Sequence, residues 1–117
     1  VWHRACDLAE LVYRLTANFP PHEQYGLTSQ MRRAATSVQA NIAEGAGRWG
    51  PSEFQRFLSM AKGSLAELDA ETAVARRLEY LTEEKAESIV SLVDEVAGMV
   101  VRLRQALARA AAEGAGR

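Results

Sequence analysis

The sequence predicts an all-α protein whose fold is an antiparallel up-down-up-down four-helix bundle. Apolar residues recur at helical spacing in four segments, at about 2–18, 28–46, 52–79 and 83–111. No run of alternating apolar and polar residues is long enough to compete as a strand. Short connections separate the segments, and short connections between long helices favour antiparallel neighbours.

The chain of 117 residues is long enough for one domain, which we expect to span residues 1–111. Proline and glycine mark two of the three breaks, which lie at Phe19-Pro20-Pro21, between Gly47 and Pro51, and at Leu81-Thr82. Residues 112–117 are mostly small and include two glycines, so we expect a flexible tail.

The segment at about 2–18 is predicted to bury one wide face. At 100° per residue, one arc of this helix collects Trp2, Ala5, Cys6, Ala9, Val12, Tyr13 and Thr16. Three leucines lie beside the arc and widen the apolar sector to about half of the helix. A surface helix needs less, so we expect another surface to cover the excess.

The segment at about 28–46 carries a core stripe and, about a right angle away, a polar seam. The core stripe consists of Met31, Ala35, Val38, Ile42 and Ala46. The polar seam consists of Gln30, Ala34, Ser37, Asn41, Glu44 and Arg48. Polar groups at the margin of a core are half-buried, and an unmet hydrogen bond there costs about 1–3 kcal/mol, so the seam needs partners.

The segment at about 52–79 is the clearest amphipathic helix. Its apolar arc contains Phe54, Phe57, Leu58, Ala61, Leu65, Leu68, Thr72 and Ala75. Ser52, with Gln55 three residues later, is typical of a capping box at its start. Beside the arc lie three polar residues that can face the seam: Ser64, Glu67 and Glu71.

The segment at about 83–111 repeats this pattern. Thr82 is the predicted N-cap, and Glu83 and Glu84 suit the positive end of the helix dipole. The apolar arc contains Ala86, Ile89, Val90, Val93, Val96, Ala97, Val100, Leu103 and Leu107.

We interpret the seam, together with Ser64, Glu67 and Glu71, as a structural network that fixes helix register or a subunit contact. Arg33 borders the seam and is assigned to it. Arg33 or Arg48 is expected to pair with Glu67 or Glu71 across the two helices. Binding of a ligand or a nucleic acid along the seam is the alternative.

Two stretches resemble a bacterial family of four-helix bundle proteins that includes proteins encoded in intervening sequences of 23S ribosomal RNA genes. They are GLTSQMRRAATSVQANIAEGAGR and FLSMAKGSLAELDAE, and the resemblance extends from Trp2 through the fourth helix. The matching residues are Gly26-Leu27, Gln30, Arg32-Arg33-Ala34, Ser37, Asn41-Ile42-Ala43-Glu44-Gly45, Arg48, Gly63-Ser64 and Glu67.

The resemblance implies an antiparallel bundle that assembles into a ring, typically a homopentamer, and it implies no established activity. A more distant relative is the accessory variability protein of diversity-generating retroelements, a basic pentamer that binds nucleic acid and its reverse transcriptase. The present chain departs from that relative in charge, because its formal net charge is −1.

The resemblance and a charge imbalance lead to a nucleic-acid hypothesis. Residues 1–62 hold seven Lys and Arg against five Asp and Glu, whereas residues 63–117 hold seven against ten. The candidate phosphate contacts, repeated around a ring, are Arg32, Arg48 and Arg56. Arg32 points away from both the core stripe and the seam on the helical wheel, so we expect it to be exposed. Ordinary ion pairs are the alternative role for these arginines.

A protein-interaction scaffold without a nucleic-acid role is the second hypothesis. Trp49, in the glycine-rich loop GAGRWGP, is its candidate anchor, since tryptophan is enriched in binding hot spots. Packing of Trp49 against its own bundle is the alternative.

The sequence gives no support for an enzyme, a metal site or a cofactor. His3 and His22 stand in different segments without ligand spacing, and Cys6 lies on a predicted core arc. The loop GAGRWG lacks the preceding strand and the Lys-Ser/Thr of a phosphate-binding loop. A single cysteine and no signal-peptide pattern point to the cytoplasm, and no membrane segment is expected.

Overall fold

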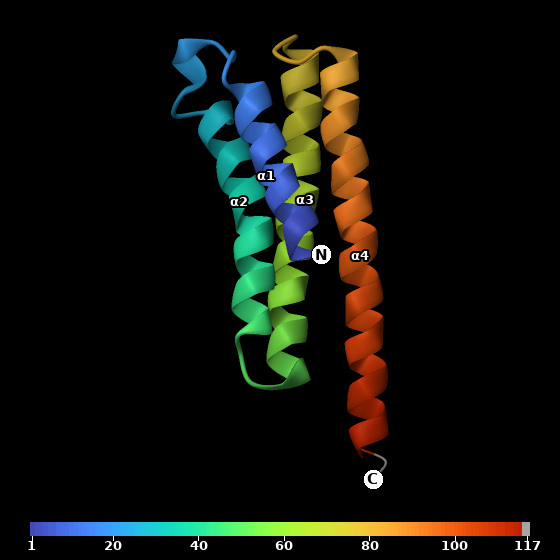
Figure 1. Cartoon of the computed structure of the whole chain (residues 1–117). Coiled ribbons are helices and arrows are strands. Elements are labelled where there is room, and N and C mark those ends of the chain that lie inside the picture. The colour runs from blue at the N-terminus through green and yellow to red at the C-terminus, as the bar shows by residue number, and fades with distance from the viewer. Residues whose placement is uncertain (116–117) are drawn as a thin grey trace.

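Four α-helices and one short 3-10 helix make up the part of the chain that the computed structural model describes, residues 1–115. They are α1 (Trp2–Thr16), η1 (Pro21–Glu23), α2 (Leu27–Ala46), α3 (Gly50–Arg77) and α4 (Glu83–Ala115). Figure 1 shows that each α-helix runs opposite to the one before it. The predicted all-α four-helix bundle is therefore confirmed, and no strand occurs within residues 1–115.

The helix bounds differ from the predicted ones by at most four residues. α1 and α3 each end two residues earlier than expected, and α4 continues to Ala115. Alanine is the best helix former, and five of the seven residues from 106 to 112 are alanines, which accounts for the continuation of α4. Residues 112–115, which were predicted to belong to a flexible tail, are helical, and residues 116–117 of that tail lie outside the described part.

One predicted cap forms and another does not. The backbone N–H of Lys85 donates to Thr82 Oγ1 at 3.2 Å, which confirms Thr82 as the N-cap of α4. α3 begins at Gly50, with Trp49 at the N-cap position and no side-chain cap, so the capping box of Ser52 and Gln55 is wrong. Gln55 instead hydrogen-bonds to Arg104 on α4.

The end of α3 carries the one non-glycine residue with a positive φ within residues 1–115, Glu79 at φ 65°. The Tyr80 N–H donates to the Ala75 carbonyl at 2.9 Å, and the Glu79 N–H donates to the Arg76 carbonyl at 3.0 Å. These two bonds form a Schellman motif, which usually has glycine at the left-handed position. The absence of a glycine explains why the sequence predicted this helix to end later.

The core is formed by one face of each α-helix. On α3 and α4 the buried residues are the predicted ones, with Phe54, Val90, Ala97, Leu103 and Leu107 half-buried at the edges. On α2, Ala46 is exposed, whereas Ala34 and Gly45 are buried.

The buried face of α1 differs from the predicted arc. It consists of Ala5, Leu8, Val12 and Thr16, whereas Trp2 and Tyr13 are 42% and 46% exposed. The indole N–H of Trp2 donates to Gln39 Oε1 at 3.1 Å. Trp2 and Tyr13 therefore lie at the margin of the core, where their polar atoms remain accessible.

The α-helices have unequal lengths, so α1 covers part of the bundle only. Trp2 bonds to Gln39 on α2, and Arg4 forms an ion pair with Glu95 on α4, which fixes the level at which α1 begins. On α3 this level lies near Ser64, which bonds to Ser37 on α2. We call residues 40–63 and 96–115 the lower half, and residues 1–39 and 64–95 the upper half (Figure 1).

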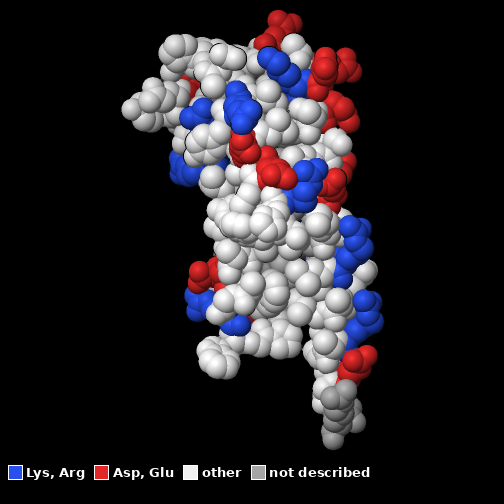
Figure 2. Space-filling model, viewed as in Figure 1, with Lys and Arg blue, Asp and Glu red and all other residues white. Residues whose placement is uncertain are grey.

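The two halves carry opposite net charge. The lower half holds six Lys and Arg against three Asp and Glu, a net formal charge of +3. The upper half holds seven against twelve, a net formal charge of −5. In Figure 2, acidic side chains gather at the upper end of the molecule and basic side chains follow the lower part of α4.

No helix within residues 1–115 combines the length and the hydrophobicity that crossing a bilayer requires.

Candidate functional site

The centre of the polar seam is a chain of hydrogen bonds between α2 and α3. Asn41 Nδ2 donates to Ser37 Oγ at 3.0 Å, and Ser37 Oγ lies 2.9 Å from Ser64 Oγ. Ser64 Oγ donates to the Met60 carbonyl at 3.3 Å, so its hydroxyl proton is engaged and Ser37 is the donor between the two serines. The seam therefore satisfies these half-buried groups internally, as a register-fixing network requires.

The predicted ion pairs across the seam do not form in the described part of the chain. Arg48 Nη2 lies 2.5 Å from Glu44 Oε1, one turn away on its own helix. Arg33 Nη2 donates to Ser29 Oγ at 3.2 Å. The expectation that either arginine pairs with Glu67 or Glu71 is therefore wrong, because each finds a partner four residues away on α2. Gln30 is exposed and takes no part in the chain of hydrogen bonds.

Glu67 and Glu71 form a carboxylate pair on α3. Glu71 Oε1 is buried, with no hydrogen-bond partner among the described residues. Burial raises the pKa of Glu71 to about 7, and the charge of Glu67 and a hydrogen bond to it add to the effect. Glu67 also lines a groove of about 430 Å³ whose other polar lining residues are Arg33, Thr36, Ser37, Gln39 and Ser64.

Arg32 contributes to the packing of α1 against α2. Its Nε donates to Thr16 Oγ1 at 2.9 Å and its Nη2 to the Tyr13 carbonyl at 3.3 Å. The guanidinium also lies 4.5 Å from the centre of the Tyr13 ring. Arg32 is half-buried and Arg33 is exposed, so the predicted exposure of Arg32 is wrong. Tyr13, at the margin of α1, covers the side of α2 that carries Arg32, which the helical wheel of α2 alone predicted to be exposed.

The turn at the lower end of α2 and α3 brings together Arg48, Trp49 and Arg56. We call these three residues the tip of the lower half. The Trp49 side chain is 95% exposed, so it does not pack against its own bundle. The guanidinium carbons of Arg48 and Arg56 lie 5.3 Å and 4.5 Å from the centre of the Phe57 ring, which places both arginines around one aromatic side chain. Arg56 Nη2 forms an ion pair with Glu53 Oε2 at 3.1 Å.

Gly45 makes this close turn possible. A Cβ atom at position 45 would lie 2.7 Å from Phe57 Cβ and 3.0 Å from Phe54 Cδ1. Only glycine lets α2 approach α3 so closely, and the approach brings Arg48 and Arg56 to the same aromatic ring.

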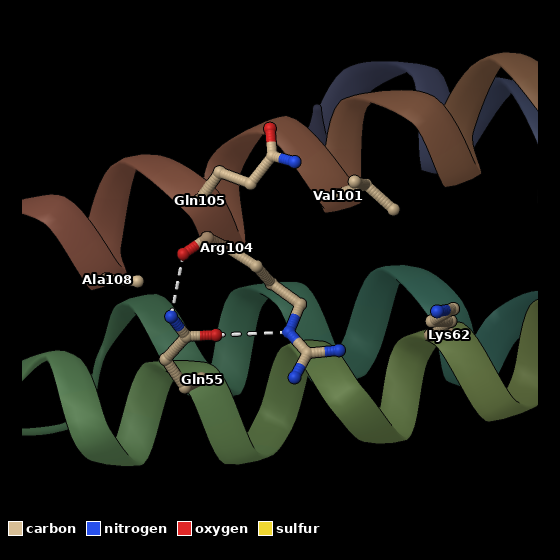
Figure 3. Close-up of a pocket in the computed structure, with 6 residues that line it drawn as sticks. All are labelled: Gln55, Lys62, Val101, Arg104, Gln105 and Ala108. Carbon is tan, nitrogen blue, oxygen red and sulfur yellow. Dashed lines mark hydrogen bonds between the residues drawn. The ribbon is translucent and has the colours of Figure 1, made fainter.

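A second polar site, which was not predicted from the sequence, lies between α3 and α4. Its groove, of about 290 Å³, is lined by Gln55, Lys62, Val101, Arg104, Gln105 and Ala108 (Figure 3). Gln55 Nε2 donates to the Arg104 carbonyl at 2.7 Å, and Arg104 Nε donates to Gln55 Oε1 at 3.0 Å. The sequence places Gln55 and Arg104 beside the core arcs of their helices. Their contact, however, depends on the register of α3 against α4.

The remaining candidate residues are dispersed. Within residues 1–115, no group of three or more His, Cys, Asp and Glu side chains could hold a metal ion. Cys6 is half-buried on α1. His22 Nε2 lies 3.3 Å from the Tyr80 hydroxyl, which also donates to Glu23 Oε2 at 3.0 Å, so this cluster links η1 to the connection between α3 and α4.

Comparisons with known proteins agree with this fold. A family model described as 23S rRNA-intervening sequence protein matches residues 1–102. A crystal structure of a protein with unknown function from the S23 ribosomal protein family of Bacteroides thetaiotaomicron VPI-5482 is similar, with a TM-score of 0.79 and 23% sequence identity. The similarity covers 88% of the present chain and 96% of that chain, and at this identity it shows the fold alone. No curated protein sequence matches the chain.

Proposed function

The chain belongs to the 23S rRNA-intervening sequence protein family, and from this premise we propose that it is a non-enzymatic, self-assembling bundle that binds RNA through its lower half. The charge separation along the bundle carries the proposal. A net formal charge of +3 on the lower half, against −5 on the upper half, concentrates positive potential at one end of a chain with a net charge of −1.

The tip of the lower half carries the two kinds of side chain that bind single-stranded RNA, an exposed aromatic ring and positive charges. Trp49 is 95% exposed and offers an aromatic face on which a base can stack. Arg48 and Arg56 are 51% and 57% exposed, so their guanidinium groups can exchange Glu44 and Glu53 for phosphate oxygens. Assembly into a ring, as a pentamer, would repeat this tip and raise the affinity without any new contact.

A binding experiment tests the RNA proposal. Fluorescence anisotropy with a labelled single-stranded RNA is measured at about 50 and 200 mM salt, where a phosphate-dependent complex loses affinity as salt rises. We expect Trp49→Ala to weaken binding, and the double variant Arg48→Gln/Arg56→Gln to weaken it and flatten the salt dependence.

The upper half offers a matched control. The double variant Arg14→Gln/Arg33→Gln removes the same charge, and Arg14 forms an ion pair with Glu10 four residues away, as Arg48 does with Glu44. Equal losses in the two double variants would indicate that net charge alone matters. Absence of binding by the unaltered protein at low salt would contradict the proposal.

A protein-interaction scaffold is the second candidate function. It is favoured by the exposure of Trp49, because a fully exposed tryptophan fits a pocket on a protein partner as well as it fits a base. If the protein is such a scaffold, Trp49→Ala should abolish binding of the protein partner, and neither the unaltered protein nor this variant should bind RNA.

A further inference from the structure

We propose that the groove between α3 and α4 in the lower half is a binding site for a phosphate group, held by Arg104 and Lys62. The groove was not among the sites predicted from the sequence. It is separate from the tip that carries Trp49, because Arg48, Trp49 and Arg56 do not line it.

Arg104 is held in place by Gln55. The side-chain amide of Gln55 engages both the Nε and the main-chain carbonyl of Arg104, at 3.0 Å and 2.7 Å. Figure 3 shows Arg104 reaching from α4 across the groove to α3, with its guanidinium group beside Gln55. A guanidinium fixed in this way has lost part of its rotamer entropy before a ligand arrives, which favours binding.

The two terminal nitrogens of Arg104 remain available for a ligand. Within the described part of the chain, Arg104 forms no ion pair, and its only side-chain hydrogen bond is the one from Nε to Gln55. Together these nitrogens present a fork of N–H donors, which matches two oxygens of a phosphate. Arg104 is half-buried, so an ion pair made there is screened less than one at an exposed site.

Lys62 supplies a second positive charge in the same groove. It is exposed and has no hydrogen-bond or ion-pair partner among residues 1–115. Gln105 adds an amide group to the rim, and Val101 and Ala108 add apolar surface. The volume of about 290 Å³ is close to the lower end of the range of small-molecule sites, about 300–1,000 Å³.

The acidic residues of α3 and α4 lie away from the groove, face another groove or are already paired. On α4, Glu95 and Glu113 are each nine residues from Arg104, which corresponds to more than about 13 Å along the helix axis. On α3, Glu67 is five residues from Lys62, about 7.5 Å along the axis and about 140° around it, and it lines the groove against α2 instead. Glu53 is engaged by Arg56. The two cations therefore lack competing carboxylates, and an external anion can neutralise them.

Phosphate is the anion class that fits this arrangement, because it accepts two hydrogen bonds from a guanidinium fork and a further one from an ammonium group. A free phosphate ion and a phosphate of an RNA chain present the same oxygens. The assignment of a phosphate does not depend on the proposed RNA function, since a free phosphate would occupy the same groove.

The first test is a titration of the whole protein with inorganic phosphate, with chloride at matched ionic strength as the reference. The readout is the NMR signal of the Arg104 Nε–H group, assigned by its loss in Arg104→Gln. We expect a saturable shift with phosphate and little shift with chloride. A linear shift, or an equal shift with the two anions, would overturn the proposal.

Variants identify the groove as the site. Lys62→Gln should weaken phosphate binding about 3- to 10-fold, and Arg104→Gln should weaken it by tenfold or more, as expected for a lost charge-assisted hydrogen bond. Because Arg104 also joins α4 to α3, Lys62→Gln keeps the test valid if Arg104→Gln unfolds. Arg109→Gln, which removes a charge from α4 outside the groove, should bind as the unaltered protein does, and an equal loss in this control would contradict the site.

RNA distinguishes the source of the phosphate. If Lys62→Gln weakens binding of both inorganic phosphate and single-stranded RNA, the groove takes a phosphate of RNA. If it weakens binding of inorganic phosphate alone, the groove takes a free phosphate, and RNA binding by the tip is judged separately from Trp49→Ala. If it weakens neither, the groove is not a phosphate site, whatever the tip binds.

Discussion

Arg32 and Arg33 are adjacent on α2 and lie in different environments. Arg32 donates to Thr16 and to the Tyr13 carbonyl and lies over the Tyr13 ring, whereas Arg33 is exposed and donates to Ser29. The residue that the sequence favoured for an external contact is therefore engaged within the bundle. Sequence alone could not show this, because the position of Tyr13 depends on how α1 is rotated against α2.

Stability measurements distinguish these two arginines. Arg32→Ala removes two hydrogen bonds and a cation–π contact, so we expect the free energy of unfolding to fall by about 1–3 kcal/mol. Arg33→Ala should change it by less than about 0.5 kcal/mol, as is usual at exposed sites. Urea unfolding followed by circular dichroism measures both values, and equal effects would show that Arg32 does not stabilise the contact between α1 and α2.

Glu71 makes stability depend on pH. Its pKa in the folded protein is raised from 4.5 to about 7, so between these pH values the folded state binds more protons than the unfolded state. The stability associated with Glu71 is therefore fully present below about pH 4.5 and is lost as the pH rises toward 7. Glu71→Gln keeps the group neutral, so we expect it to raise the melting temperature at pH 8 more than at pH 5.

An exposed carboxylate provides the control for this measurement. Glu87 on α4 is exposed, and Glu87→Gln should shift the melting temperature little and equally at the two pH values. If Glu71→Gln has the same small effect at pH 8 as at pH 5, Glu71 is not kept protonated by its surroundings.

At the scale of helices, α2 and α3 are joined by close approach as well as by hydrogen bonds. Gly45 faces Phe54 and Phe57, whereas Gly63 on α3 has no atom within 4 Å of a Cβ placed on it. The two glycines therefore respond in opposite ways to the same substitution. Gly63→Ala gains helix propensity and should stabilise by up to about 1 kcal/mol.

The added methyl group at position 45 must displace a neighbour. Its nearest contact, 2.7 Å from Phe57 Cβ, lies against a rigid part of that side chain, so Gly45→Ala should destabilise by about 1–3 kcal/mol despite the gain in helix propensity. Chemical denaturation of the two variants gives both values. Stabilisation by both substitutions would show that α2 and α3 are free to move apart at this turn.

The buried faces of the helices were predictable from the sequence to different degrees. α3 and α4 each have one apolar arc, and their buried residues follow from periodicity alone. The buried face of α1 was predicted with the wrong rotation about the helix axis. The reason is that Trp2 and Tyr13 combine large apolar bodies with polar atoms and occupy the margin of the core. The seam was predicted as a set of residues, but its hydrogen-bond partners depend on the register between helices, which the sequence does not contain.

At the scale of the whole molecule, folding creates a charge separation that is weak along the sequence. Residues 1–62 and 63–117 differ modestly in charge, whereas the fold combines residues 40–63 with 96–115 into a half with a net formal charge of +3. The groove with Gln55 and Arg104 arises in the same way, from residues that are 49 positions apart. Both candidate anion-binding features therefore required the three-dimensional arrangement.

The short α1 also leaves part of the core without a fourth helix. α1 has 15 residues and α4 has 33, about 22 Å and 50 Å at 1.5 Å per residue. Phe54, Leu103 and Leu107, all in the lower half, are half-buried and pack against the core. In Figure 2, the middle of this half is largely free of charged side chains. If the bundle assembles with copies of itself, this uncharged surface is where we expect another subunit to pack.

A substitution in this surface tests the expectation. Leu107→Glu places a charge at a half-buried position of the lower half, whereas Ala106→Glu places the same charge at an exposed position on the same helix. By light scattering, the unaltered protein and Ala106→Glu should have the mass of an oligomer, a multiple of 12.8 kDa, and Leu107→Glu a smaller mass with its helix content retained. Burying an unpaired carboxylate in a subunit contact is costly, so dissociation is the expected result. A mass of 12.8 kDa for the unaltered protein at all concentrations would contradict assembly, and an unchanged oligomer in Leu107→Glu would place the contact elsewhere on the bundle.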